Sequence, residues 1–155
     1  MAVEIERKFL VRRELWQPKE AGIAIVQGYL CSDAERTVRV RTWNEQAYLT
    51  VKGKNRGIRR LEFEYEIPFS DAKELLALCE QPVISKRRYV EQHVDNRWEI
   101  DVFEGDNEGL ILAEVELLSE DAEISLPEWA GPEVSGDKRY YNSYLFRCPY
   151  RLWKE

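Results

Sequence analysis

The sequence predicts a β-rich α+β domain in which eight antiparallel strands close into a barrel, with helices packed on its outside. Apolar and polar residues alternate with a period of two along most of the 155 residues, and short turn signals separate the alternating runs. A sheet of this size tends to curl and close on itself. No linker rich in Gly, Ser or Pro divides the chain, so we expect residues 1–155 to form one domain.

The alternating runs give the predicted elements in chain order. Strands are expected at residues 3–11, 24–31, 35–43, 46–53, 58–68, 85–93, 96–104 and 110–118. Ser70 is a suitable N-cap for a helix that runs to about Cys79, and a second helix is expected to begin near Asp137. The segment 127–132, which begins and ends with proline, is expected to be a loop.

Sorting each strand by residue parity puts charged side chains on one face and apolar side chains on the other. In the run 58–68, Glu62 and Glu64 alternate with Leu61 and Phe63. For one strand alone, a charged face in contact with water is the simpler interpretation. For a closed barrel whose apolar face lies outside under helices, the charged face is the lumen. Because unpaired buried charge is costly, such a lumen is expected to hold water, a metal ion and a charged ligand.

Carboxylates that converge from several strands match the hard oxygen ligands that Mg²⁺ or Mn²⁺ prefers. Two pairs stand at positions i and i+2 of one face, and each pair can contact one ion. The pairs are Glu4 with Glu6 and Glu114 with Glu116, and Glu62 and Glu64 are further candidate ligands on the charged face.

The basic residues of the same face suit a chain of phosphates, since arginine binds phosphate through two nitrogens and lysine acts as a point charge. A lysine crowded by other cations can act as a base because its pKa falls. We expect Lys86 in that role, beside Tyr29, which can equally be a ring that fills the barrel. The candidate phosphate-binding residues are Lys8, Arg39, Arg41, Lys52, Arg60, Lys86 and Arg88.

Composition limits the partners. A net charge of −6 disfavours nucleic acid and anionic membranes as partners. No apolar run is long enough to span a membrane and no signal peptide is recognisable, so a cytoplasmic protein is expected. Cys31, Cys79 and Cys148 lack metal-ligand spacing and are expected to be free thiols. The sequence leaves a monomer and a homodimer equally open.

Glu4-Ile5-Glu6-Arg7-Lys8 resembles the ExExK signature of the CYTH, or triphosphate tunnel metalloenzyme, superfamily. Further segments that resemble the superfamily follow in order, including Gln27–Leu30, Arg39–Arg41, Thr50–Gly53, Arg60–Glu64, Lys86–Tyr89, Asp101–Phe103 and Glu114–Glu116. The resemblance implies an eight-stranded tunnel, a divalent cation and a triphosphate substrate. It maps the metal ligands to Glu4, Glu6, Glu114 and Glu116 with Asp101 nearby. It also places Arg139 in a C-terminal segment, either closing one tunnel end or on a helix surface.

The compact chain is most similar to inorganic triphosphatases, which cleave tripolyphosphate to pyrophosphate and phosphate. A thiamine triphosphatase or a class IV type adenylyl cyclase would use the same lumen but would need a pocket for the organic group. A non-catalytic module that binds polyphosphate or nucleotides is the alternative from another class. Such a module gains nothing from carboxylates that face its anionic ligand, whereas a metal-dependent enzyme requires them, with Glu4 and Glu6 as catalytic ligands.

Overall fold

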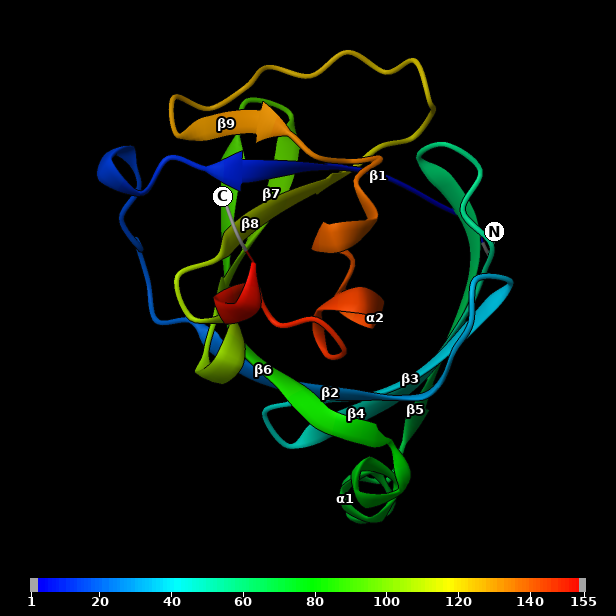
Figure 1. Cartoon of the computed structure of the whole chain (residues 1–155). Coiled ribbons are helices and arrows are strands. Elements are labelled where there is room, and N and C mark those ends of the chain that lie inside the picture. Colours follow the sequence, from blue (N-terminus) through cyan, green and yellow to red (C-terminus); the bar gives the residue numbers. More distant parts are fainter. Residues whose placement is uncertain (1–2, 154–155) are drawn as a thin grey trace.

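The computed structural model describes residues 3–153, and nine antiparallel strands form its one sheet. Neighbours in the sheet follow the order β5-β4-β3-β2-β6-β7-β8-β1-β9, and a further pairing of β5 with β1 closes strands β1–β8 into a barrel (Figure 1). The strands are β1 (Val3–Val11), β2 (Ile23–Ser32), β3 (Arg36–Trp43), β4 (Gln46–Gly53), β5 (Arg59–Ile67), β6 (Glu80–His93), β7 (Asn96–Phe103), β8 (Ile111–Glu116) and β9 (Ala130–Glu133). The predicted closed barrel of eight strands is confirmed.

β1 is the strand that closes the barrel. One edge of it pairs with β8, and the start of its other edge pairs with β5, where Val3 lies opposite Leu61. Farther along that second edge, β9 pairs with β1 and places Val11 opposite Ala130. The loop predicted at 127–132 was therefore wrong over residues 130–132, which belong to β9. This short segment contains Gly and Pro and has little strand propensity of its own; it becomes a strand because the edge of β1 beyond β5 is free to pair.

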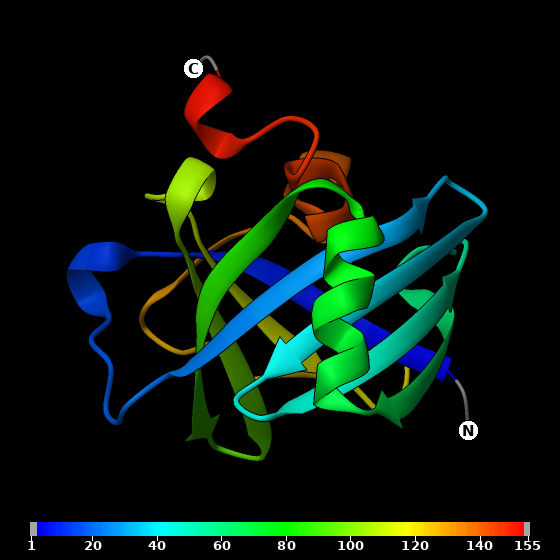
Figure 2. The same ribbon diagram turned by 90° about the horizontal axis from the view of Figure 1, so that it is seen from below.

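Helix α1 (Phe69–Leu78) lies on the outside of the barrel and contacts β2, β3 and β4 (Figure 2). Its buried Ala72 packs in a cluster with Val40 and Ala47. The predicted N-cap was wrong: Pro68 caps the helix and no side chain accepts a capping hydrogen bond, so Ser70 lies inside the first turn. The Pro68 carbonyl accepts the first helical hydrogen bond from the backbone N–H of Ala72, at 3.1 Å.

The C-terminal part of the chain does not form the single helix expected from Asp137. It forms a 3₁₀ turn, η3 (Lys138–Tyr140), the short helix α2 (Asn142–Leu145) and a second turn, η4 (Tyr150–Leu152). Viewed along the barrel, η3 and α2 lie within the ring of strands (Figure 1), and the perpendicular view places them at one end (Figure 2). This segment, residues 138–146, is called the plug below. Both expected helices were predicted to pack on the outside of the barrel, but only α1 does so.

The apolar faces of the strands point outward, as the parity pattern predicts. Trp98, Ile100 and Val115 are fully buried beneath the loops that carry Trp16 and Trp129. Both loop indoles are fixed by one carboxylate, because the Nε1 atoms of Trp16 and Trp129 donate to Glu91 at 3.0 and 3.2 Å. The remaining 3₁₀ turns are η1 (Arg13–Leu15) and η2 (Gly105–Asn107).

No helix among residues 3–153 combines the length and the apolar character that crossing a membrane requires.

Candidate active site

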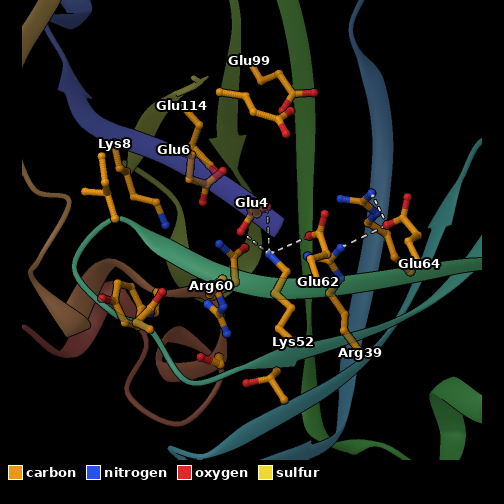
Figure 3. Close-up of a pocket in the computed structure, with 18 of the residues that line it drawn as sticks. Glu4, Glu6, Lys8, Arg39, Lys52, Arg60, Glu62, Glu64, Glu99 and Glu114 are labelled. Carbon is orange, nitrogen blue, oxygen red and sulfur yellow. Dashed lines mark hydrogen bonds and ion pairs between the residues drawn. The ribbon is translucent and has the colours of Figure 1, made fainter. Parts of the chain in front are cut away.

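A charged cavity of about 240 Å³ occupies the interior of the barrel (Figure 3). Strands on all sides contribute to it, because the alternate residues of each strand point inward. Its charged lining consists of Glu4, Glu6, Lys8, Arg39, Arg41, Lys52, Arg60, Glu62, Glu64, Lys86, Arg88, Glu99, Glu114 and Glu116. The polar residues Tyr29, Asn142 and Ser143 also reach it. Acidic and basic side chains therefore share one internal space.

Carboxylates crowd together where β1 faces β8. Glu6 lies opposite Glu116 in the register of the two strands, and Lys8 lies opposite Glu114. Burial raises the pKa of Glu6, and the charges of Glu114 and Glu4 raise it further. Burial also raises the pKa of Glu4, although Lys52 opposes that shift. Glu4 and Glu6 are therefore short of positive charge. The pKa of Glu114, in contrast, is lowered: burial opposes the shift, but the charges of Lys8 and Arg88 outweigh it.

That shortage fits a hard divalent cation. A bound cation would allow Glu4, Glu6, Glu114 and Glu116 to be ionised together, and oxygen is the ligand atom that Mg²⁺ and Mn²⁺ prefer. Among residues 3–153, no three acidic, His or Cys side chains already converge on a common point. Mg²⁺ usually keeps several waters and binds substrate phosphates as well as one or two carboxylates, so an incomplete protein ligand set suits it.

The carboxylates of β5 are already balanced by cations. Lys52 Nζ lies 3.2 Å from Glu62 and 3.3 Å from Glu4, and so joins β5 to β1 (Figure 3). Glu64 lies 3.3 Å from the guanidinium of Arg41 and 3.5 Å from that of Arg39. Glu62 and Glu64, expected as metal ligands, thus line the cavity as ion-pair partners of the basic residues.

The arginines of the cavity carry donors without partners. The buried Nε atoms of Arg39, Arg41 and Arg60 make no hydrogen bond to any residue that the structure describes. Burial, together with the positive charges of Arg39 and Arg88, lowers the pKa of Arg41 to about 10. Buried N–H groups are nearly always paired in proteins, and guanidinium groups bind phosphate strongly. All three side chains line the cavity, so an anionic ligand there would pair with their guanidinium groups.

Lys86 and Arg88 converge on Asp101. Lys86 Nζ lies 2.8 Å from Asp101, and Arg88 donates two hydrogen bonds to the same carboxylate at 2.7 and 2.9 Å. The side chains of Lys86 and Asp101 are only 2 % and 1 % exposed. Burial lowers the pKa of Lys86 to about 8, although Asp101 opposes the shift. Asp101, expected near the metal, does not line the cavity and is the counter-ion of two buried cations.

Tyr29 lies at the plugged end of the cavity, where its ring fills space as one of the two interpretations expected. Its ring stacks on Phe146 of the plug, with centroids 5.4 Å apart, while its hydroxyl accepts a hydrogen bond from Gln27 Nε2 at 3.1 Å. Burial raises its pKa, which keeps the hydroxyl protonated. Arg139 does not line the cavity; it is half exposed and pairs with Asp137 at 2.7 Å.

The sequence interpretation left several residues of the cavity lining without a role, among them Trp43, Glu99 and Asn142. Glu99 stood on the charged face by parity, so a signal for it existed. Trp43 lies with its ring centroid 5.6 Å from the guanidinium carbons of both Arg41 and Arg88. Asn142 belongs to the plug, and nothing in the spacing of the sequence marked it or its hydrogen-bond partner Gln27.

Asp101→Asn is expected to lower the free energy of unfolding by about 3–5 kcal/mol, since removing one partner of a buried ion pair leaves the other charges uncompensated. Urea denaturation of the metal-free protein measures it. Asp121→Asn, which changes an exposed aspartate, is the matched control. Unchanged stability combined with lost metal affinity would instead make Asp101 a metal ligand.

Comparison with known proteins gives one family. A family model described as the CYTH domain matches residues 2–141. An inorganic triphosphatase of Acetivibrio thermocellus is 49% identical over 156 residues and covers 100% of both chains, and one of Nitrosomonas europaea is 36% identical and covers 92% of this chain and 95% of its own. A crystal structure of an inorganic triphosphatase matches with a TM-score of 0.67 at 34% identity, over 99% of this chain and 97% of that one. These matches, which agree with the charged tunnel seen in the structure, show that the chain belongs to the CYTH domain family.

Proposed function

We propose that this protein is a metal-dependent triphosphatase that hydrolyses inorganic triphosphate to pyrophosphate and phosphate. The observation that carries the proposal is the pairing, within one cavity, of crowded carboxylates with arginines whose buried Nε atoms lack partners. A metal–polyphosphate complex supplies both missing charges. The activity named for the relatives at 49% and 36% identity agrees with it.

Binding is divided between the two kinds of side chain. Lys8, Arg39, Arg41, Lys52, Arg60 and Arg88 bind the phosphate oxygens. Glu4, Glu6, Glu114 and Glu116 would hold Mg²⁺ or Mn²⁺, and the ion would supply positive charge to neutralise the charge that develops on the phosphates. Glu62 and Glu64 orient Lys52, Arg39 and Arg41, because their carboxylates pair with those bases.

Hydrolysis needs a water molecule in line with the terminal phosphorus and a group that accepts its proton. We assign that group to Lys86, whose pKa of about 8 leaves a substantial neutral fraction near neutral pH. The water oxygen forms a bond to the terminal phosphorus, the bridging P–O bond breaks, and the proton passes to Lys86 Nζ. The protonated Tyr29 hydroxyl lies at the same end of the cavity and is available to donate a hydrogen bond to a phosphate oxygen.

Other activities of the same lumen are less well supported. The relatives above 30% identity are named for inorganic triphosphate, and not for thiamine triphosphate or for cyclisation of a nucleotide. A non-catalytic polyphosphate or nucleotide binder would have no use for Glu4, Glu6 and Glu114 facing its anionic ligand.

The test is phosphate release from tripolyphosphate, ATP and thiamine triphosphate, each with Mg²⁺, Mn²⁺ or a chelator, together with an assay for cyclic AMP. We expect hydrolysis only with metal, and tripolyphosphate as the preferred substrate. Equal turnover in chelator would contradict the metal requirement. Cyclisation of ATP in preference to triphosphate hydrolysis would contradict the assigned reaction.

The compartment, domain organisation and partners that we propose are those expected from the sequence. The three cysteines are free thiols in the structure, which agrees with a reducing compartment, and we place the protein in the cytoplasm. We propose that residues 1–155 act as one domain, as a monomer or homodimer, on a small-molecule substrate and without nucleic acid or membrane partners.

A further inference from the structure

The plug brings one amide side chain into the cavity. Asn142, the first residue of α2, lines the cavity, while Leu145 and Phe146 of the same segment are buried in the core beside Tyr29. The buried ring of Tyr140 anchors the segment on the other side of Asn142. Apolar packing on both sides therefore fixes the position of the Asn142 amide. The family match ends at residue 141, immediately before Asn142.

The Asn142 oxygen accepts two hydrogen bonds. Lys86 Nζ and Gln27 Nε2 each lie 3.1 Å from Oδ1, and Gln27 Nε2 lies 3.1 Å from the Tyr29 hydroxyl. The amide nitrogen of Gln27 only donates, as does the ammonium form of Lys86, so the oxygen of Asn142, and not its NH₂ group, faces both. Gln27 is fully buried and its Oε1 has no partner among the described residues. Asn142 thus connects Lys86 to Tyr29 through the side chain of Gln27.

The same segment holds a second lysine of the cavity. Lys8 Nζ donates to the backbone carbonyl of Tyr140 at 3.2 Å and lies 5.5 Å from the ring centroid of Tyr141. Lys8 belongs to β1 and Lys86 to β6, so three consecutive residues of the plug contact lysines from two walls of the barrel. Closing one end of the tunnel would not require these contacts.

We infer that Asn142 is a positioning residue that orients the lone pair of neutral Lys86 toward the cavity, an inference that rests on the proposed function. A neutral amine has two hydrogens and one lone pair. The oxygens of Asp101 and Asn142, at 2.8 and 3.1 Å from Nζ, can only accept, so they take the two hydrogens. The lone pair is left to point in the remaining direction, and Lys86 is one of the residues that line the cavity.

Without the Asn142 oxygen, one hydrogen of Lys86 has no fixed partner and the amine can rotate. Asn142→Ala is expected to lower kcat by about 10- to 100-fold, the scale of loss that misorientation of a reacting group produces. The KM for tripolyphosphate should change less than about threefold, because Asn142 is not among the assigned phosphate ligands. Binding of tripolyphosphate with Mg²⁺, measured by calorimetry, should likewise be nearly unchanged.

Asn142→Asp keeps an acceptor oxygen and adds a negative charge. The charged groups around Lys86 are Asp101 on β7, Arg88 on β6 and Glu114 on β8. An added carboxylate favours the ammonium form, so the limb of the pH–kcat profile that reports Lys86 should move to higher pH, with kcat well above that of Asn142→Ala on its plateau. Tyr144→Phe, an exposed change in the same helix, is the control for the folding of the plug.

Wild-type kcat in Asn142→Ala, or a pH limb that stays in place in Asn142→Asp, would overturn the inference. Equal losses in kcat and in tripolyphosphate affinity would also overturn it. So would an unfolded plug in Asn142→Ala combined with no recovery of kcat in Asn142→Asp. Absence of hydrolysis in the wild-type protein with metal would instead contradict the proposed function. The two failures are therefore distinguishable.

Discussion

Glu6→Gln is expected to lower metal-dependent triphosphate hydrolysis by about 100-fold or more without destabilising the protein, since metal-ion charge stabilisation is worth several kcal/mol. Glu6 is buried beside Glu114 and Glu4, so the change removes a carboxylate from a group that is short of positive charge. The activity loss should be accompanied by a higher Mg²⁺ requirement. Steady-state kinetics over a range of Mg²⁺ concentrations measures both.

The stability of Glu6→Gln has a definite sign. Because burial and neighbouring carboxylates raise the pKa of Glu6 in the folded state, the unfolded state loses its proton first as pH rises, and Glu6 opposes folding at neutral pH. Glutamine cannot ionise, so the metal-free variant should be as stable as the wild type at neutral pH, or more stable. Chemical denaturation in chelator tests this. Loss of both activity and stability would point to a structural role.

Glu4→Ala and Glu116→Ala test two further members of the same set of proposed metal ligands. Both should abolish detectable metal-dependent activity. Glu4→Ala also frees Lys52, which lies 3.3 Å from Glu4, so it is expected to weaken the β1–β5 closure as well. Glu6→Gln is the cleaner test for that reason.

Lys86→Met is expected to lower kcat by about 10²- to 10⁴-fold, the usual contribution of a general base. Methionine fits the buried space, and Arg88 still pairs with Asp101, so the fold should persist. KM for tripolyphosphate should rise only a few-fold. Lys73→Met, on the exposed side of α1, is the matched control.

The pH dependence of kcat gives the second readout of Lys86. Burial lowers the pKa of Lys86 to about 8; below that pH the ammonium form predominates and cannot accept a proton. Activity of the wild type should therefore rise with pH through about 8, and Lys86→Met should lack this limb. A wild-type profile with no limb in that region, or an identical limb in the variant, would exclude Lys86 as the base.

Much of the barrel follows from local pattern alone. Alternation along β5 and β7 assigned the inward and outward faces correctly, because parity depends only on neighbouring residues. The same rule brought Glu4, Glu6 and Glu114 into one cavity. It failed for β9, since Ala130–Glu133 forms a strand only through pairing with a free stretch of β1.

Other features depend on register and packing. Asp101 and Glu99 share a face, yet Asp101 is neutralised because β6 brings Lys86 and Arg88 against it, while Glu99 remains in the cavity lining. Glu99 is also paired, with Arg88 at 3.3 Å and Arg97 at 3.1 Å, but it stays partly exposed. Sequence patterns do not tell a fully buried ion pair from a paired carboxylate that lines the cavity. The contact between Asn142 and Lys86 joins residues 56 positions apart, and it arises from the burial of the plug rather than from any periodicity.

The most direct test of the charged tunnel as the active site is a crystal structure with Mn²⁺ and a non-hydrolysable triphosphate analogue, with anomalous diffraction to locate the metal. We expect the anomalous peak among Glu4, Glu6, Glu114 and Glu116, and the phosphates against the guanidinium groups of Arg39, Arg41 and Arg60. Metal and phosphates bound on the outer surface, with only water inside the barrel, would contradict the account.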